Sequence, residues 1–289
     1  MIKWLAVLLM IVDHIGYYFE FLMPEPFVIG LRLIGRLSFP IFAYSIALGF
    51  LRTKNRTRYF LRMFLFACIT QVMLAVTAYF THTGTFTNVM FTFSLAILMM
   101  AAAEFLEKTS TSLLTGYSQG NAVGDSKNSK EGKTSPSPQV EIYGHTISAS
   151  LGSVLAIIFI ILIIGVTTFF DPDYNIFGIF YVYIFYIIQK RIRKRGLTLA
   201  EDRHALKIMI VSILGLNLAW ALFNISFSST AIYWILMEIF SVFSIGILLL
   251  DKPRQKPARW EKYFFYIFYP AHLVLLMLLK YSLSIFALR

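Results

Sequence analysis

The sequence predicts an all-α fold: a polytopic integral membrane helix bundle with about nine transmembrane helices and a cytoplasmic N-terminus. The first reason is composition, because hydrophobic residues make up 58% of the chain and charged residues only 14%. Soluble domains hold about 25% charged residues, so this composition excludes an ordinary soluble domain. The second reason is a series of long apolar stretches, and the third is the one-sided distribution of basic residues between them.

The apolar stretches have the length that a bilayer-crossing helix needs, which is about 20 residues with some variation. The predicted spans are residues 4–23, 28–51, 60–80, 87–106, 147–169, 174–190, 206–223, 230–250 and 263–287.

The basic residues predict the orientation of these spans. Placing the N-terminus inside puts 22 of the 26 Lys and Arg residues in cytoplasmic segments, while the short outer turns contain none. The cytoplasmic segments are Lys3, 52–62, 107–146, 190–207 and 251–262. This pattern follows the positive-inside rule and predicts a multi-pass protein of the cell membrane, inner or plasma. Topology therefore explains the net charge of +11, and we expect the lipid bilayer as a partner and no nucleic acid.

Composition also predicts the division of the chain. Residues 1–106 hold the first four predicted helices, and residues 147–289 hold the last five. Residues 107–146 between them are rich in Ser, Thr, Gly, Asn and Lys, so we expect a disordered cytoplasmic linker that cannot bury a core. We expect the two helical parts to form one membrane domain overall.

Ionisable residues near the middle of the predicted spans mark the candidate site. Asp13 and His14 lie at the centre of the first span and His272 lies deep in the last, while Arg36 and Glu238 lie in the second and eighth. An ionisable residue at that depth costs roughly 2.5–3.5 kcal/mol on insertion scales, so it usually has a partner or a function. Structural ion pairs explain Asp13, Arg36 and Glu238 about as well as function does. The histidines favour function, because imidazole titrates near neutral pH.

Helix geometry separates the roles of the two neighbours in the first span. Asp13 and His14 are adjacent, so their side chains diverge by about 100° and do not aim at one point. We expect His14 to carry chemistry and Asp13 to form an ionic tie, with Arg36 as the favoured partner. Arg32 shares a helical face with Arg36, because residues four apart stack.

Two prolines adjoin these polar residues and predict local breaks in the helices. Pro40 leaves the carbonyl of Arg36 without its helical hydrogen bond, and Pro270 does the same to the carbonyl of Tyr266. Irregular backbone at membrane depth is tolerated where protein or a polar cavity surrounds it. Both breaks therefore support a polar site at this depth.

Four motifs resemble the TraX family, named for the pilin acetylase of conjugative plasmids. They are Asp13-His14-Ile15-Gly16, the run Gly35-Arg36-Leu37-Ser38-Phe39-Pro40-Ile41-Phe42-Ala43-Tyr44, the run Phe268-Tyr269-Pro270-Ala271-His272-Leu273, and the weaker Asn88-Val89-Met90-Phe91-Thr92. The family is similar to multi-pass acyltransferases in which a first-helix histidine serves acyl transfer. The resemblance implies that His14 is a general base or transient acyl carrier, with Arg36 and His272 in support.

The resemblance implies a membrane-embedded acyltransferase that uses cytosolic acetyl-CoA as co-substrate, and the buried residues fit that chemistry. The expected catalytic residues are His14, His272, Arg36 and Asp13, and the expected substrate-binding residues are Glu238, Arg32, Tyr269 and Asn88. The acceptor would be an amine or hydroxyl on a peptide N-terminus, a glycan or a lipid-linked molecule. The basic loops Arg52–Arg62 and Lys190–Arg195 are candidates for binding the phosphates of coenzyme A, although topology explains most of these charges.

Two other functions compete with acyl transfer. A proton-coupled transporter would also bury His, Asp and Glu, but no internal repeat of the kind common in transporters is visible. A haem protein ligated by His14 and His272 ranks third. The single cysteine, Cys68, excludes an all-cysteine metal cluster within one chain, and we expect no metal or haem.

Overall fold

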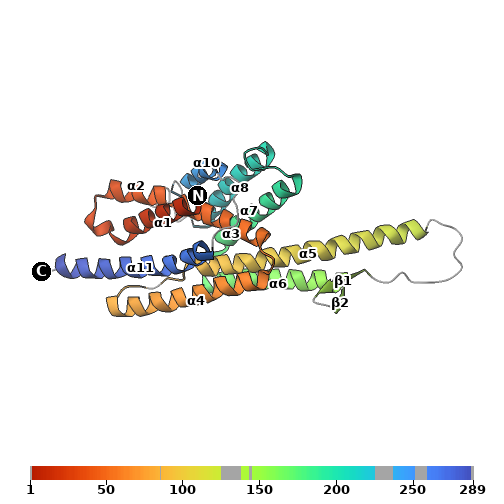
Figure 1. Cartoon of the computed structure of the whole chain (residues 1–289), viewed down its shortest axis with the longest axis horizontal. Coiled ribbons are helices and arrows are strands. Elements are labelled where there is room, and N and C mark those ends of the chain that lie inside the picture. The colour runs from red at the N-terminus through yellow and green to blue at the C-terminus, as the bar shows by residue number, and fades with distance from the viewer. Residues whose placement is uncertain are drawn as a thin grey trace. The chain divides into compact units, whose positions relative to one another are not determined.

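The computed structural model describes residues 2–84, 86–124, 138–142, 145–224, 237–250 and 259–287. Most of these residues are helical, as predicted, and Figure 1 labels the elements in chain order. The elements are α1 (Ile2–Tyr18), η1 (Glu20–Leu22), α2 (Glu25–Gly35), α3 (Ser38–Arg52), α4 (Arg56–Thr81), α5 (Val89–Gly124), β1 (Gln139–Ile142), β2 (His145–Ser148), α6 (Ala149–Phe170), α7 (Asn175–Arg195), α8 (Arg203–Asn224), η2 (Ser241–Phe243), α10 (Ser244–Leu249) and α11 (Arg259–Ala287).

Six helical segments within the described residues are long and apolar enough to cross a membrane, and they confirm the predicted class. They are Glu25–Arg52, Arg56–Thr81, Val89–Tyr117, Ala149–Phe170, Arg203–Phe223 and Tyr263–Ile285. The other three predicted spans correspond to α1, which has 17 residues, to α7, and to a short apolar helix at Met237–Leu249. Residues 230–236 of the eighth predicted span lie outside the described residues. The count of about nine and the side of the N-terminus therefore stay predictions.

The segment expected to be a disordered linker contains regular structure. The chain forms two compact units, residues 1–97 with 170–289 and residues 98–169, so the expected linker at 107–146 falls within the second. There α5 continues to Gly124, and β1 pairs antiparallel with β2. Residues 125–137 lie outside the described residues. Strong helix formers such as Ala, Glu, Leu and Lys at 101–108 carry α5 past the apolar stretch, and the alternating pattern of β1 suits a strand.

A break between α2 and α3 interrupts the second predicted span. The α2 helix ends at Gly35 and α3 begins at Ser38, so Arg36 and Leu37 lie between them. Pro40 explains the break, because its ring provides no N–H for the carbonyl four residues earlier and crowds it. The prediction of irregular backbone beside Arg36 is confirmed, whereas α11 continues as a helix through Pro270.

The α1 and α2 helices pack against each other in an unusually close antiparallel pair. A Cβ added to Gly35 would lie 2.2 Å from Cβ of Asp13, and one added to Gly16 would lie 3.0 Å from Cβ of Leu31. Glycine at position 35 therefore lets the two backbones approach at the level of Asp13. This approach fixes which residues of α2 can reach Asp13.

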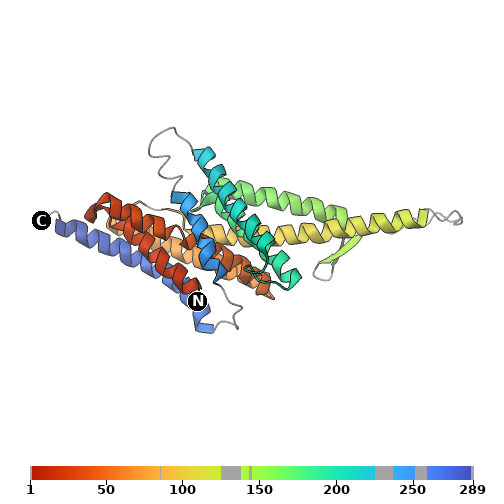
Figure 2. The ribbon, with the colours of Figure 1, turned by 90° about the horizontal axis from the view of Figure 1, so that it is seen from above.

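The first and last helices of the chain lie side by side and run in the same direction. The rings of Trp4 and Phe264 are 4.8 Å apart at one level, and the rings of His14 and His272 are 5.1 Å apart further along. Figures 1 and 2 both show α1 beside α11. Two histidines separated by most of the sequence thus meet in space.

Replacing Gly35 with Ala should destabilise the fold, because the new methyl group overlaps Asp13 and forces α1 away from α2. Overpacking of this kind costs about 1–3 kcal/mol. Gly30→Ala in the same helix is the matched control, because a Cβ there meets no described atom within 4 Å and Ala gains up to about 1 kcal/mol of helix propensity. Thermal unfolding in detergent would measure both. Equal melting temperatures for the two variants would contradict the close contact.

Candidate functional site

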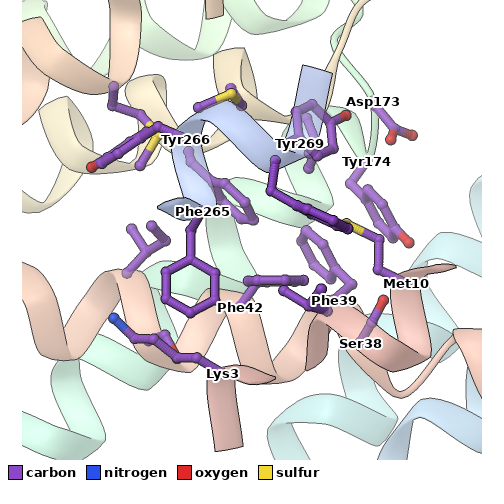
Figure 3. Close-up of a pocket in the computed structure, with 18 of the residues that line it drawn as sticks. Lys3, Met10, Ser38, Phe39, Phe42, Asp173, Tyr174, Phe265, Tyr266 and Tyr269 are labelled. Atoms are coloured by element: carbon purple, nitrogen blue, oxygen red, sulfur yellow. The ribbon is translucent and has the colours of Figure 1, made fainter. Parts of the chain in front are cut away.

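A cavity of about 670 Å³ lies within the first compact unit, lined by residues from α1, α2, α3, α4, α5, α11 and the loop between α6 and α7. Five of the eight predicted site residues line it: Asp13, His14, Arg32, Arg36 and Tyr269. Aromatic side chains such as Phe39, Phe42 and Phe265 form much of the remaining wall (Figure 3). The cavity therefore combines an apolar wall with a few charged groups, as small-molecule sites do.

One ring nitrogen of His14 forms a hydrogen bond to the backbone, and the other is available as a base. Its Nδ1 lies 2.7 Å from the carbonyl oxygen of Met10, one turn earlier on α1. A carbonyl accepts and cannot donate, so Nδ1 carries the hydrogen and a neutral His14 keeps a lone pair on Nε2. The side chain is thus arranged as a base beside the cavity.

His272 of α11 lies in contact with His14. The two rings meet edge to face at 80°, and the Nδ1 of His272 donates to the carbonyl of Phe268 at 3.0 Å. The His272 side chain does not line the cavity, and it is 7% exposed. Its Nε2 has no hydrogen-bond partner among the described residues. A porphyrin cannot fit between rings this close, so the arrangement argues against haem held by both histidines.

Two ion pairs neutralise most of the buried charge. Nη1 of Arg32 lies 2.7 Å from Oδ2 of Asp13, and Nε of Arg36 lies 3.4 Å from Oε1 of Glu238. The ionic tie expected between Asp13 and Arg36 is therefore corrected to Arg32. The close approach at Gly35 explains this, because it brings the α2 face that carries Arg32 against Asp13.

Two site residues, Asp173 and Tyr174, were not predicted, because the sequence places Asp173 in an outer turn and Tyr174 at the start of the sixth predicted span, 174–190. The Tyr174 ring stacks on Phe39 with centroids 3.7 Å apart, and Nη1 of Arg36 donates to its hydroxyl at 3.4 Å. The backbone of Asp173 is held by Thr87, whose carbonyl accepts from its N–H at 2.9 Å, and by the hydroxyl of Thr92. Tyr174 has a left-handed backbone with φ of 63°. The sequence of this turn, which contains Asp and Pro, gives no sign that its side chains line a cavity.

Asp173 is one of the residues that line the cavity, and Figure 3 shows it next to Tyr174. The surrounding protein removes this carboxyl from bulk water and raises its pKa to about 6, although the neighbouring Arg36 lowers the pKa. The cavity therefore contains, besides His14, a carboxyl whose pKa lies above its usual value.

The remaining predicted site residues do not line the cavity. Glu238 reaches the site through its ion pair with Arg36. The amide of Asn88 donates to Oε1 of Gln71 at 2.9 Å and to the carbonyl of Ala67 at 3.0 Å, and its Oδ1 accepts from the N–H of Met90 at 3.1 Å. Asn88 thus caps α5 and joins it to α4, so we leave it out of the proposed substrate contacts.

Metal ligation finds no support in the described part of the chain, where no three His, Cys, Asp or Glu side chains are placed to hold an ion. The expectation that the protein needs no metal stays a prediction.

The six apolar helical segments define a multi-pass membrane protein, and its first compact unit holds a cavity with an apolar wall and a few charged groups. The chain belongs to the TraX family, whose family model, described as TraX protein, matches residues 1–280. No curated protein and no solved structure matches it. Family membership is consistent with a membrane transferase and does not favour a transporter.

The Asp13–Arg32 pair should show strong energetic coupling. Asp13→Asn or Arg32→Gln alone leaves a partly buried charge without its partner, whereas the double variant removes both charges. We expect the double variant to be more stable than the sum of the single effects predicts, by about 1–3 kcal/mol. Thermal unfolding of the three variants measures this, with the exposed Glu20→Gln as control. Additive effects would mean that the two side chains do not interact.

Asp173 should make stability depend on pH. Its folded pKa of about 6 lies above the usual 3.8, so the fold favours the protonated carboxyl. The stabilisation is complete below about pH 4 and is lost as the pH rises towards about 6. We expect Asp173→Asn to lose less stability than the parent protein between these pH values, measured by thermal unfolding. Parallel pH profiles for the two proteins would contradict the assignment.

Proposed function

We propose that this protein is a membrane-embedded acyltransferase that moves an acetyl group from acetyl-CoA to an amine or hydroxyl acceptor. The acceptor would lie at or beyond the membrane, on a peptide N-terminus, a glycan or a lipid-linked molecule, and the membrane would be the cell membrane. The observation that carries the proposal is the position of His14 at the cavity wall, with Nδ1–H bound to Met10 and Nε2 left as a base. Membership of the TraX family supports the same class of reaction.

In the proposed reaction, Nε2 of His14 takes the proton from the acceptor amine or hydroxyl as that group attacks the thioester carbonyl. The attack forms a bond to the carbonyl carbon and places negative charge on its oxygen. When the oxyanion collapses, the carbon–sulfur bond breaks and the coenzyme A thiolate leaves. The imidazolium of His14 returns its proton to the thiolate, so the base is regenerated. Were His14 instead a transient acyl carrier, the same Nε2 would be the attacking atom.

Arg36 is the proposed stabiliser of the oxyanion. It follows the α2 helix at the break, and its side chain lines the cavity while Glu238 and Tyr174 hold it. A guanidinium fixed before substrate arrives stabilises developing charge without reorganisation, and the effect is large where water is excluded. Glu238 and Tyr174 are thus proposed to position Arg36, and Asp13 does the same for Arg32.

His272 is the proposed support of His14. Its edge-to-face contact restricts the His14 ring, and its own Nδ1 is committed to Phe268. A neutral His272 in contact with His14 adds no positive charge that would oppose protonation of His14 during the attack. Tyr269 lies three residues before His272 on α11. It lines the cavity and is a proposed substrate contact.

His14→Ala should abolish acetyl transfer while leaving the protein folded, because the change removes the basic nitrogen but strands no buried charge. His272→Ala should reduce transfer strongly in the same assay. The measurement is turnover of labelled acetyl-CoA in matched membranes, with identification of the labelled acceptor and thermal stability recorded alongside. Gly30→Ala, away from the cavity, is the control. Normal turnover by stable His14→Ala protein would refute the mechanism.

A further inference from the structure

The cavity extends well beyond the histidines to a second, positively charged end. Lys3 of α1, Arg52 at the end of α3 and Arg62 of α4 all line it, together with one acid, Glu261. Figure 3 shows Lys3 on the side of the cavity opposite Asp173 and Tyr174. The sequence places all three basic residues in cytoplasmic segments, so this end is the one that faces the predicted cytoplasmic side.

The distance between the two ends follows from helix geometry. Lys3 and His14 lie on one helix, and a rise of about 1.5 Å per residue separates them by roughly 16 Å. Arg52 and Ser38 mark the two ends of α3 and are roughly 21 Å apart by the same rule. Both pairs line the same cavity, which is therefore a long chamber that joins His14 to the basic end.

Aromatic contacts position Arg62, and no described carboxylate forms an ion pair with it. Its guanidinium lies 5.8 Å from the ring centre of Tyr59 and 5.7 Å from that of Tyr266, and its Nε donates to the Tyr266 hydroxyl at 3.5 Å. Among the described residues, no carboxylate forms an ion pair with Arg62 or Arg52. Stacking thus orients Arg62 while leaving its charge available to an anion.

The second basic loop predicted as a candidate for phosphate binding, Lys190–Arg195, lies away from the cavity. None of the residues Lys190–Arg195 lines the cavity. Arg193 donates to the carbonyl of Leu51 at 2.6 Å, and Lys190 lies over the Tyr186 ring. The structure therefore separates two clusters that the sequence alone could not distinguish.

We propose that Arg52 and Arg62, assisted by Lys3, bind the phosphates of the acyl donor and so select donors that carry their acyl group on a long phosphorylated arm. This inference rests on the proposed function. An extended phosphopantetheine arm has a length comparable to the separation of Lys3 and His14, so phosphates held at the basic end place the thioester beside His14. Guanidinium groups bind phosphate oxygens through paired, charge-assisted hydrogen bonds. A donor without phosphates gains nothing from this end of the chamber.

The test compares two donors, acetyl-CoA and acetyl-pantetheine, which has the same arm but no phosphate. We expect Arg62→Gln to lower the preference for acetyl-CoA, measured as the ratio of the two kcat/KM values, by about tenfold or more, since a hydrogen bond to a charged group is worth roughly 1.5–3 kcal/mol. The change should appear in KM for acetyl-CoA. Arg52→Gln, at an exposed helix end, should act in the same direction and serves if Arg62→Gln folds poorly. Arg191→Gln, exposed and outside the cavity, should keep the ratio.

Binding of unacylated coenzyme A, measured by its effect on thermal unfolding, separates this inference from the proposed function. We expect it to stabilise the parent protein and the His14→Ala variant, and to stabilise Arg62→Gln much less. Normal stabilisation of Arg62→Gln and Arg52→Gln, or an unchanged donor ratio, would overturn the phosphate site while leaving acyl transfer intact. Active His14→Ala protein with a normal Arg62 effect would overturn the mechanism at His14 but keep the phosphate site.

Discussion

Neutralisation of charge inside an apolar helix bundle is the constraint on which the other features of this site depend. Asp13, Arg32, Arg36 and Glu238 cannot lie at membrane depth as isolated ions, because desolvation of an unpaired ion is too costly. Their pairing specifies how α1 meets α2 and how the residues just before η2 meet the α2–α3 break. Gly35 permits the first contact and Pro40 the second, so two residues without polar side chains determine where the ions are placed.

The histidines depend on this arrangement in turn. With Asp13 engaged by Arg32, His14 is left without a carboxylate partner in the described structure, and its Nδ1 binds a backbone carbonyl instead. A neutral imidazole of this kind suits a base that must hold a proton briefly and then release it. Arg36 and Asp173 line the same chamber and give it a basic and an acidic group. The site thus resembles a preorganised polar environment enclosed by aromatic walls.

Sequence reasoning predicted the membrane class and several of the residues that line the cavity, because both follow from rules that are local in sequence. Apolar length predicted the helices, and buried ionisable residues predicted His14, His272 and Arg36. Sequence reasoning failed for features that depend on tertiary packing. The partner of Asp13 depends on the approach of two backbones at Gly35, and the inward fold of Asp173 and Tyr174 depends on contacts with Thr87, Thr92 and Phe39. The extended α5 helix shows that polar composition alone does not imply disorder.

The contact between α1 and α11 has a consequence for the synthesis and membrane insertion of the protein. Helices are inserted into the membrane in the order of their synthesis, and His14 leaves the ribosome long before His272. Until α11 is inserted, the face of α1 that packs against it has no partner. The aromatic contacts of Trp4 and His14 with α11 are then missing. A nascent or truncated chain therefore carries His14 in a chamber that lacks the wall supplied by α11. Completion of the last helix therefore coincides with completion of the cavity wall.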